Sequence, residues 1–144
     1  MSEVSKSPLA PRRFPHIPEV AGVRLAVAAA GIKHRRRNDL LLAALSQGTT
    51  AAGVFTRSST ASAPVMWSRD NITSGRVRAL LVNSGNANAF TGDQGMLDVR
   101  WSAGRIAKAL ACRPAGVLVA STGGIGEPLP VNRIDAVVPR LIGS

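Results

Sequence analysis

A hydroxyl side chain beside glycines, directly after an aliphatic run, is the first feature of this sequence suited to catalysis. The segment Ser121–Gly126 (STGGIG) follows Val117–Ala120 (VLVA), a run typical of a buried strand. Thr122 offers a hydroxyl and an N–H, and Gly123 offers an N–H that no side chain obstructs. Such donors at the carboxyl end of a strand can stabilise a developing oxyanion. On this segment alone, a glycine-rich turn without a chemical role is the open alternative.

A second polar loop, Asn83–Gly92 (NSGNANAFTG), also follows an aliphatic run and precedes a helical pattern. Backbone N–H groups at the start of a helix favour an anion. Asn and Gly also tolerate left-handed backbone conformations, so the loop could simply turn the chain. Both interpretations stay open. The Ser121–Gly126 segment lacks the Lys-Ser/Thr ending of a phosphate-binding P-loop and the G-x-G-x-x-G spacing of a dinucleotide site.

The charge of the chain is strongly positive, with 18 Lys and Arg against 8 Asp and Glu, a formal net charge of +10. Such a charge attracts nucleic acids, membrane surfaces or acidic small molecules. The densest basic run is Lys33–Arg37 (KHRRR), and no aromatic residues interleave with it as single-stranded nucleic-acid binders require. We interpret the run as a solvated loop, with a basic nucleic-acid-binding module as the alternative.

Aliphatic runs separated by Gly, Asn and Ser predict the elements that position these loops. We expect strands at Gly22–Ile32, Leu40–Leu45, Ala51–Thr56, Ala63–Trp67, Ala79–Asn83 and Val117–Ala120.

Two helices are expected. The first begins at Asp93, is capped by Thr91 or Asp93, and ends near Cys112. The second covers Val131–Leu141 with Asn132 as its cap. The apolar stripe of the first helix consists of Met96, Val99, Ala103, Ile106 and Leu110.

The length and composition of the chain limit the possible domain organisation and class of protein. Its 144 residues fit one domain, and 45% hydrophobic residues are enough for a core. One cysteine excludes an internal disulfide, and the longest apolar run, Leu25–Ile32, is too short to span a membrane. We expect a loosely ordered or disordered leader over residues 1–18, a folded part over residues 19–144, and a soluble cytoplasmic protein. The expected fold is α/β, a mixed β-sheet with helices packed on it.

The two loops and their flanks together resemble a known family. The chain contains AAGIK (29–33), TTAAGVFT (49–56), APV (63–65), VNSGNANAFTGDQG (82–95) and LVASTGGIGEPLP (118–130), in this order. This pattern is similar to the N-terminal, α-chain part of the ornithine acetyltransferase (glutamate N-acetyltransferase, ArgJ) family, over Glu19 to Ile142. The resemblance implies the DmpA/ArgJ-like fold, incomplete in this chain.

The resemblance also implies an activity, namely acetyl transfer from N-acetylornithine, and in some members from acetyl-CoA, to glutamate in arginine biosynthesis. Family members are made as one precursor that cleaves itself before a threonine, which becomes the nucleophile at the start of the β chain. The expected partner is therefore a β chain in an α2β2 heterotetramer. Thr122 and Gly123 would line the oxyanion hole. No metal and no cofactor is implied, apart from acetyl-CoA as an acetyl-donor substrate.

Two residues depart from the family pattern, and some family residues lie beyond the sequence. Gly124 stands where an aliphatic residue is common, and Phe90 where a small residue or Cys is common. The sequence stops before the family's cleavage threonine, so we expect this chain alone to be inactive. Besides the nucleic-acid-binding module, a fragment of a self-processing aminopeptidase or amidase and a non-functional remnant are alternatives.

Overall fold

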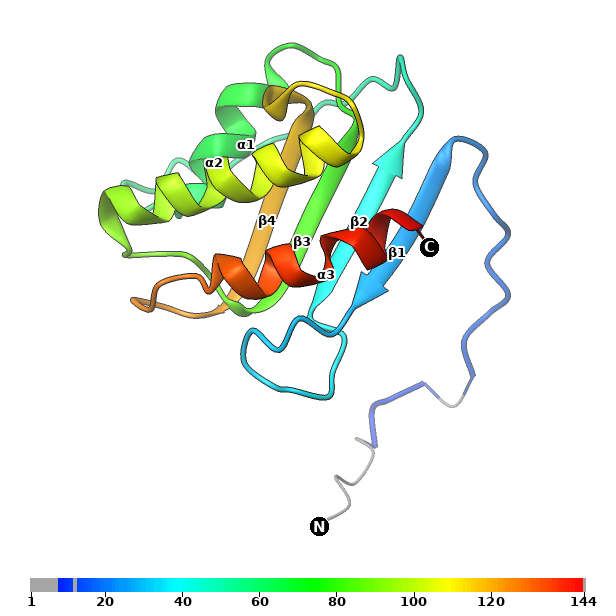
Figure 1. Cartoon of the computed structure of the whole chain (residues 1–144), viewed down its shortest axis with the longest axis horizontal. Coiled ribbons are helices and arrows are strands. Elements are labelled where there is room, and N and C mark those ends of the chain that lie inside the picture. Colours follow the sequence, from blue (N-terminus) through cyan, green and yellow to red (C-terminus); the bar gives the residue numbers. More distant parts are fainter. Residues whose placement is uncertain (1–7, 12, 144) are drawn as a thin grey trace.

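The fold is built on a four-stranded mixed sheet with the strand order β1-β2-β3-β4 (Figure 1). The computed structural model of the chain describes residues 8–11 and 13–143, so the predicted leader lies partly outside the described residues. The strands are β1 (Val23–Ala28), β2 (Leu40–Leu45), β3 (Ala79–Asn86) and β4 (Val117–Gly124). β1, β2 and β3 pair antiparallel, whereas β3 and β4 pair parallel. The loop between β1 and β2 therefore lies at the same end of the sheet as the carboxyl ends of β3 and β4.

Helices cover one face of this sheet. α2 (Gly92–Ala109) connects the parallel strands β3 and β4, followed by a short 3₁₀ turn, Pro114–Gly116. α3 (Val131–Gly143) lies next to α2 on the same face (Figure 1). The expected α/β fold, a mixed sheet with helices packed on it, is confirmed.

The core lies between the sheet and these two helices. Alternate strand residues point towards the helices and are buried, while their neighbours point to the other face. The buried cluster includes Leu40, Leu42, Leu81, Val117, Val119, Val99, Ala103, Ile106, Ile134 and Leu141. On the other face, called the open face below, the side chains of Val23, Leu25 and Val27 on β1 are 39%, 64% and 45% exposed. The sheet thus has one filled apolar face and one that the described chain leaves open.

The remaining helix, α1 (Ala63–Ile72), packs against β4, the strand at one end of the sheet order. The Trp67 Nε1–H donates to the Val117 carbonyl at 2.9 Å. The Ser68 hydroxyl donates to the Val119 carbonyl at 2.7 Å and accepts from the Val119 N–H at 2.9 Å. Side chains of α1 thereby satisfy backbone groups of β4 that have no neighbouring strand, which protects a sheet edge from unwanted pairing.

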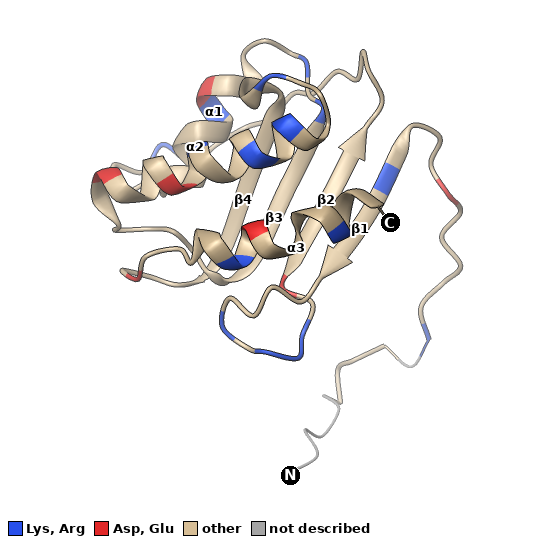
Figure 2. Ribbon diagram, viewed as in Figure 1, with Lys and Arg blue, Asp and Glu red and all other residues tan. Residues whose placement is uncertain are grey.

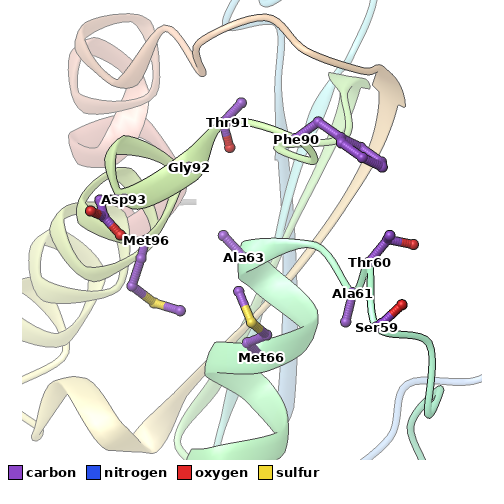
Figure 3. Close-up of a pocket in the computed structure, with 10 residues that line it drawn as sticks. All are labelled: Ser59, Thr60, Ala61, Ala63, Met66, Phe90, Thr91, Gly92, Asp93 and Met96. Atoms are coloured by element: carbon purple, nitrogen blue, oxygen red, sulfur yellow. The ribbon is translucent and has the colours of Figure 1, made fainter.

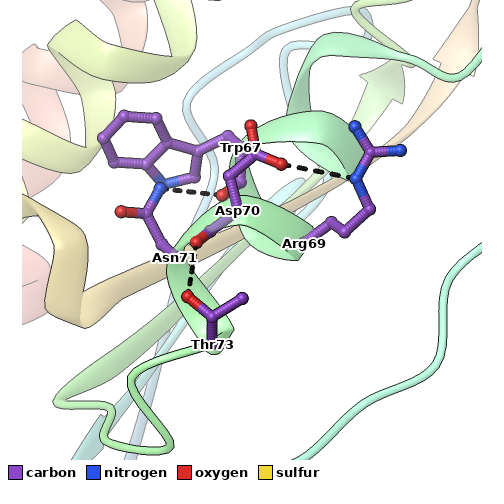
Figure 4. A network of polar contacts seen from close by, with 5 residues as sticks. All are labelled: Trp67, Arg69, Asp70, Asn71 and Thr73. Carbon is purple, nitrogen blue, oxygen red and sulfur yellow. Dashed lines mark hydrogen bonds and ion pairs between the residues drawn. The ribbon is translucent and has the colours of Figure 1, made fainter.

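Polar contacts also close the C-terminal end of α1 (Figure 4). The Asn71 side-chain amide donates to the Trp67 carbonyl at 2.8 Å, and the Thr73 hydroxyl donates to the Asp70 carbonyl at 2.9 Å. Arg69 and Asp70 form an exposed ion pair at 3.3 Å. The Thr73 bond satisfies a carbonyl of the last turn of the helix, where intrahelical backbone partners are lacking.

Two expected strands are wrong. Residues 51–56 form no strand, since no strand of the described part of the chain pairs with them, and Val54 is 99% exposed. Ala63–Trp67 begins α1 instead, with Pro64 in the first turn, where its missing N–H costs nothing and its fixed φ suits a helix. A short apolar run does not distinguish a strand from a helix by itself.

The expected helices exist, but their caps differ. The apolar stripe of α2 is confirmed, with Val99, Ala103 and Ile106 buried and with Met96 and Leu110 half-buried. Thr91 is the N-cap residue of α2 but makes no side-chain cap bond. Asn132 is not the cap of α3, because the helix already begins at Val131.

The last strand is longer than expected. β4 continues through Gly124, into the segment that was expected to be a loop.

Candidate active site

The predicted oxyanion donors lie on the last residues of β4, beside an irregularity of the sheet. Gly123 pairs with Gly85, and the register of β3 against β4 shifts between Gly85 and Asn86. Gly123 has φ +136°, and a Cβ at this position would lie 2.2 Å from the carbonyl carbon of Gly85. Only glycine fits this position. Bulges of this kind often re-aim groups next to active sites.

Thr122 lies on the open face of the sheet. Along β4, Val117 and Val119 are buried towards the helices, and Leu118 and Ala120 alternate to the other side. Thr122 continues this second set, is exposed, and pairs with the exposed Ser84 of β3. Within the described part of the chain its hydroxyl has no hydrogen-bond partner. The hydroxyl is thus available to a group that approaches the open face.

Three asparagines of the Asn83–Gly92 segment, whose first four residues belong to β3 rather than to the expected loop, hold the ends of β3 and β4 in place. The Asn83 amide donates to the Asn86 carbonyl at 2.8 Å, and its oxygen accepts from the Ser121 hydroxyl at 2.5 Å. The Asn86 amide donates to the carbonyls of Glu127 and Pro128 at 3.0 and 3.2 Å. These side chains therefore join β3 to β4 and to the loop that follows β4.

The third asparagine, Asn88, ties the same loop to α2. Its N–H donates to the Asn86 side-chain oxygen at 2.7 Å, and its amide donates to the Gly95 carbonyl at 2.9 Å. The Thr91 hydroxyl donates to the Asn88 side-chain oxygen at 2.8 Å. Asn83, Asn86 and Asn88 are 2%, 3% and 0% exposed, so their amides are occupied within the fold. The sequence left two interpretations open, an anion site and a turn of the chain. For these side chains the structure favours the turn.

A pocket that the sequence did not predict lies between the N-terminal ends of α1 and α2 (Figure 3). It encloses about 490 Å³. Met66 and Met96 give it an apolar lining, and Thr60 and Asp93 are among its polar residues. Phe90, which is 70% exposed and has φ +56°, also lines it. Thr122 and Gly123 do not, so the pocket and the predicted oxyanion donors are separate features.

The single thiol lies away from the predicted donors, just before the beginning of β4. Cys112 is half-buried, and burial raises its pKa, while the Arg78 guanidinium opposes that shift. A thiol with a raised pKa is a poor nucleophile at neutral pH. Among residues 8–11 and 13–143, no group of three or more His, Cys, Asp and Glu side chains is close enough to hold a metal ion. In the same residues, no helix is long and apolar enough to cross a membrane.

The chain was compared with known protein families, curated proteins and solved structures. The ArgJ family profile matches residues 24–144. The chain belongs to the ArgJ family. An ArgJ protein named "arginine biosynthesis bifunctional protein" from Bradyrhizobium diazoefficiens is 52% identical over 137 residues, covering 95% of this chain and 33% of the relative. The relative from Rhizobium meliloti, with the same name, is 49% identical over 97% of this chain and 34% of its own length.

Solved structures of family members have the same fold. The ornithine acetyltransferase of Mycobacterium tuberculosis, solved in complex with ornithine, matches with a TM-score of 0.82 and 41% identity, over 86% of this chain and 67% of that one. The ArgJ protein of Bacillus halodurans matches with a TM-score of 0.77 and 32% identity, over 82% of this chain and 62% of that one. The chain spans about a third of the length of the curated relatives it matches.

Proposed function

We propose that this chain is the N-terminal part of an acetyltransferase of arginine biosynthesis, which moves an acetyl group from N-acetylornithine to glutamate. Membership of the ArgJ family and the likeness to an ornithine acetyltransferase bound to ornithine support this proposal. The observation that carries it is the position of Thr122 and Gly123, at the carboxyl end of a strand and beside a glycine-to-glycine contact. Strand ends of this type commonly contact ligands in α/β folds.

The proposed reaction proceeds in two steps through an acyl-enzyme. A threonine hydroxyl outside this chain attacks the acetyl carbonyl of N-acetylornithine, a C–O bond forms, the C–N bond breaks, and the proton passes to the leaving amine of ornithine. The amine of glutamate then attacks the ester carbonyl, a C–N bond forms, the C–O bond to the threonine breaks, and the proton lost by the amine passes to the threonine oxygen. Both steps develop negative charge on the same carbonyl oxygen. The Thr122 hydroxyl and the N–H of Gly123 stabilise that charge.

The open face of the sheet supports the proposal that another segment supplies the nucleophile. Val23, Leu25 and Val27 are exposed on this face, and Thr122 lies on the same side. Exposed apolar patches of this kind mark surfaces that another protein segment covers. We propose that a β chain carrying an N-terminal threonine, released by self-cleavage of one precursor, packs on this face. The complete enzyme would be an α2β2 heterotetramer without metal or cofactor, located in the cytoplasm.

The test compares this chain alone with a completed protein, in which the chain is continued by the C-terminal two thirds of the Bradyrhizobium relative. Acetyl transfer from N-acetylornithine to glutamate is measured for both, with the unaltered Bradyrhizobium protein as the control for the assay. The chain alone should show no transfer, and the completed protein should be active. Transfer by the chain alone would refute the external nucleophile. A folded but inactive completed protein would refute the proposed activity.

A further inference from the structure

The open face of the sheet changes from apolar to polar towards the ends of β3 and β4. Two rows of paired apolar side chains cross this face on the two strands, Leu80–Leu118 and Val82–Ala120. The next row pairs Ser84 with Thr122, so two hydroxyl residues lie side by side at the edge of an apolar surface. The register is regular through this pair and shifts only after Gly85. Ser84 is therefore the direct neighbour of the predicted oxyanion donor Thr122 on the adjacent strand.

The hydroxyl of Ser84 is free, whereas its backbone is held in place. Ser84 is exposed, and none of the described residues forms a hydrogen bond with its hydroxyl, as is also the case for Thr122. The Ser84 N–H donates to the Asp39 carbonyl at 2.8 Å, and the strand pairs with β4 on its other side. A donor on a fixed backbone is already oriented when a ligand arrives, which is what electrostatic stabilisation of a transition state requires.

The two hydroxyls need an acceptor once the open face is covered. The proposed β chain would remove both from water, and a buried hydroxyl without a partner is unfavourable. β3 and β4 contain no charged residue, and the basic run Lys33–Arg37 lies in the exposed loop between β1 and β2 (Figure 2). These two strands therefore offer neutral hydrogen-bond donors, rather than a cation, to a negative charge that develops above them.

We propose that Ser84 is a further catalytic residue, whose hydroxyl donates to the same oxyanion as Thr122 and Gly123. Paired residues on neighbouring strands are about 4.8 Å apart, so an oxygen held between two such hydroxyls can lie about 2.8 Å from each. A carbonyl oxygen has two lone pairs, and the oxyanion of the tetrahedral intermediate has one more. Thr122 and Gly123 occupy the lone pairs of the bound carbonyl, and Ser84 donates to the additional one as the charge develops.

This inference rests on the proposed acetyl transfer and adds one residue to it. The nucleophile and the bonds that form and break are unchanged, and Ser84 keeps its proton throughout. A hydrogen bond made only in the transition state raises kcat without tightening the binding of the substrate. Loss of the Ser84 hydroxyl should therefore lower kcat and leave KM nearly unchanged.

The test compares Ser84→Val with Ser84→Thr in the completed enzyme, because the two side chains have nearly the same shape and only threonine carries a hydroxyl. Ser84→Val should lower kcat for transfer from N-acetylornithine to glutamate by roughly 10², with KM within about twofold. Ser84→Thr should keep kcat within a few-fold of the unsubstituted enzyme, and Ser84→Ala should behave like Ser84→Val. Urea unfolding of this chain should not distinguish the valine and threonine variants, since the side chain is exposed. Equal kcat in these two variants would overturn the assignment, as would a loss that appears only in KM.

Acetylation by p-nitrophenyl acetate separates this inference from the proposed function. The nucleophilic threonine forms a C–O bond to the acetyl carbon, the C–O bond to nitrophenolate breaks, and the hydroxyl proton passes to water. The burst of nitrophenolate should slow in Ser84→Val and not in Ser84→Thr. A burst that depends on the Ser84 hydroxyl, in an enzyme without transfer to glutamate, would refute the proposed function and support the Ser84 assignment. A folded completed enzyme with neither burst nor transfer would refute both.

Discussion

Gly85 and Gly123 lie back to back where β3 and β4 end, so close that a Cβ on Gly123 would stand 2.2 Å from the Gly85 carbonyl carbon. The contact fixes the backbone of Thr122 and Gly123 within the last residues of β4. Two glycines separated by 38 positions thus position the predicted oxyanion donors.

Replacing Gly123 with alanine should destabilise the chain by about 2–5 kcal/mol. The new Cβ meets backbone rather than a flexible side chain, and φ +136° is a conformation that side chains rarely adopt. Urea unfolding measures the change. Gly124→Ala is the matched control, because its Cβ would lie 3.6 Å from the Glu127 carboxylate, an ordinary contact, and should alter stability by less than about 0.5 kcal/mol. Equal effects of the two substitutions would contradict the close-contact argument.

Thr122→Ala in the completed enzyme should lower kcat by roughly 10²–10³, about 3–4 kcal/mol of transition-state stabilisation, with little change in KM. The substitution removes the hydroxyl and leaves both backbone N–H groups. Thr122→Ser retains the hydroxyl and should keep kcat within a few-fold of the unsubstituted enzyme. Steady-state kinetics with N-acetylornithine and glutamate decides the matter. If Thr122→Ala retains normal kcat, the hydroxyl is not a donor and only the backbone assignment survives.

The two faces of the sheet should respond differently to the same truncation. Leu42 is 1% exposed in the core, so Leu42→Ala should cost about 2–5 kcal/mol in urea unfolding. Leu25 is 64% exposed on the open face, so Leu25→Ala should change stability by less than about 0.5 kcal/mol. Leu25→Asp should also weaken association with the proposed β chain, measured by co-purification. Unimpaired association would show that the open face is not the docking surface.

The spacing of the apolar residues and the order of the aliphatic runs along the sequence were enough to predict the four strands of the sheet and α2. They also predicted that the Thr122 segment follows a strand. The 3–4 spacing in α2 works because its stripe faces one continuous core. The same alternation in β4 that buries Val117 and Val119 places Thr122 on the open face. Both patterns are local in the sequence, so they can be recognised without knowing which distant segments pack against the element.

Features that depend on distant contacts were not predictable in this way. The run Ala63–Trp67 is apolar enough for a strand, but in the structure it forms the first half of α1, which packs against β4. The pocket between α1 and α2 was missed because Ala63–Trp67, the first half of α1, was expected to be a strand. The role of Asn83, Asn86 and Asn88 stayed open because amide side chains suit an anion site and a turn equally until their partners are known.

Ser68→Ala should destabilise the chain by about 2–4 kcal/mol. The Ser68 hydroxyl is buried and bonds to both the N–H and the carbonyl of Val119, so alanine would leave two buried backbone groups of β4 without a partner. Thr73→Ala is the control on the same segment, because its hydroxyl also bonds to a carbonyl but is exposed, where water replaces it. Its effect in urea unfolding should stay below about 0.5 kcal/mol. Ser68→Ala should also increase aggregation, measured by light scattering, because the edge of β4 loses its cover. Unchanged stability and scattering would show that α1 protects this edge by packing alone.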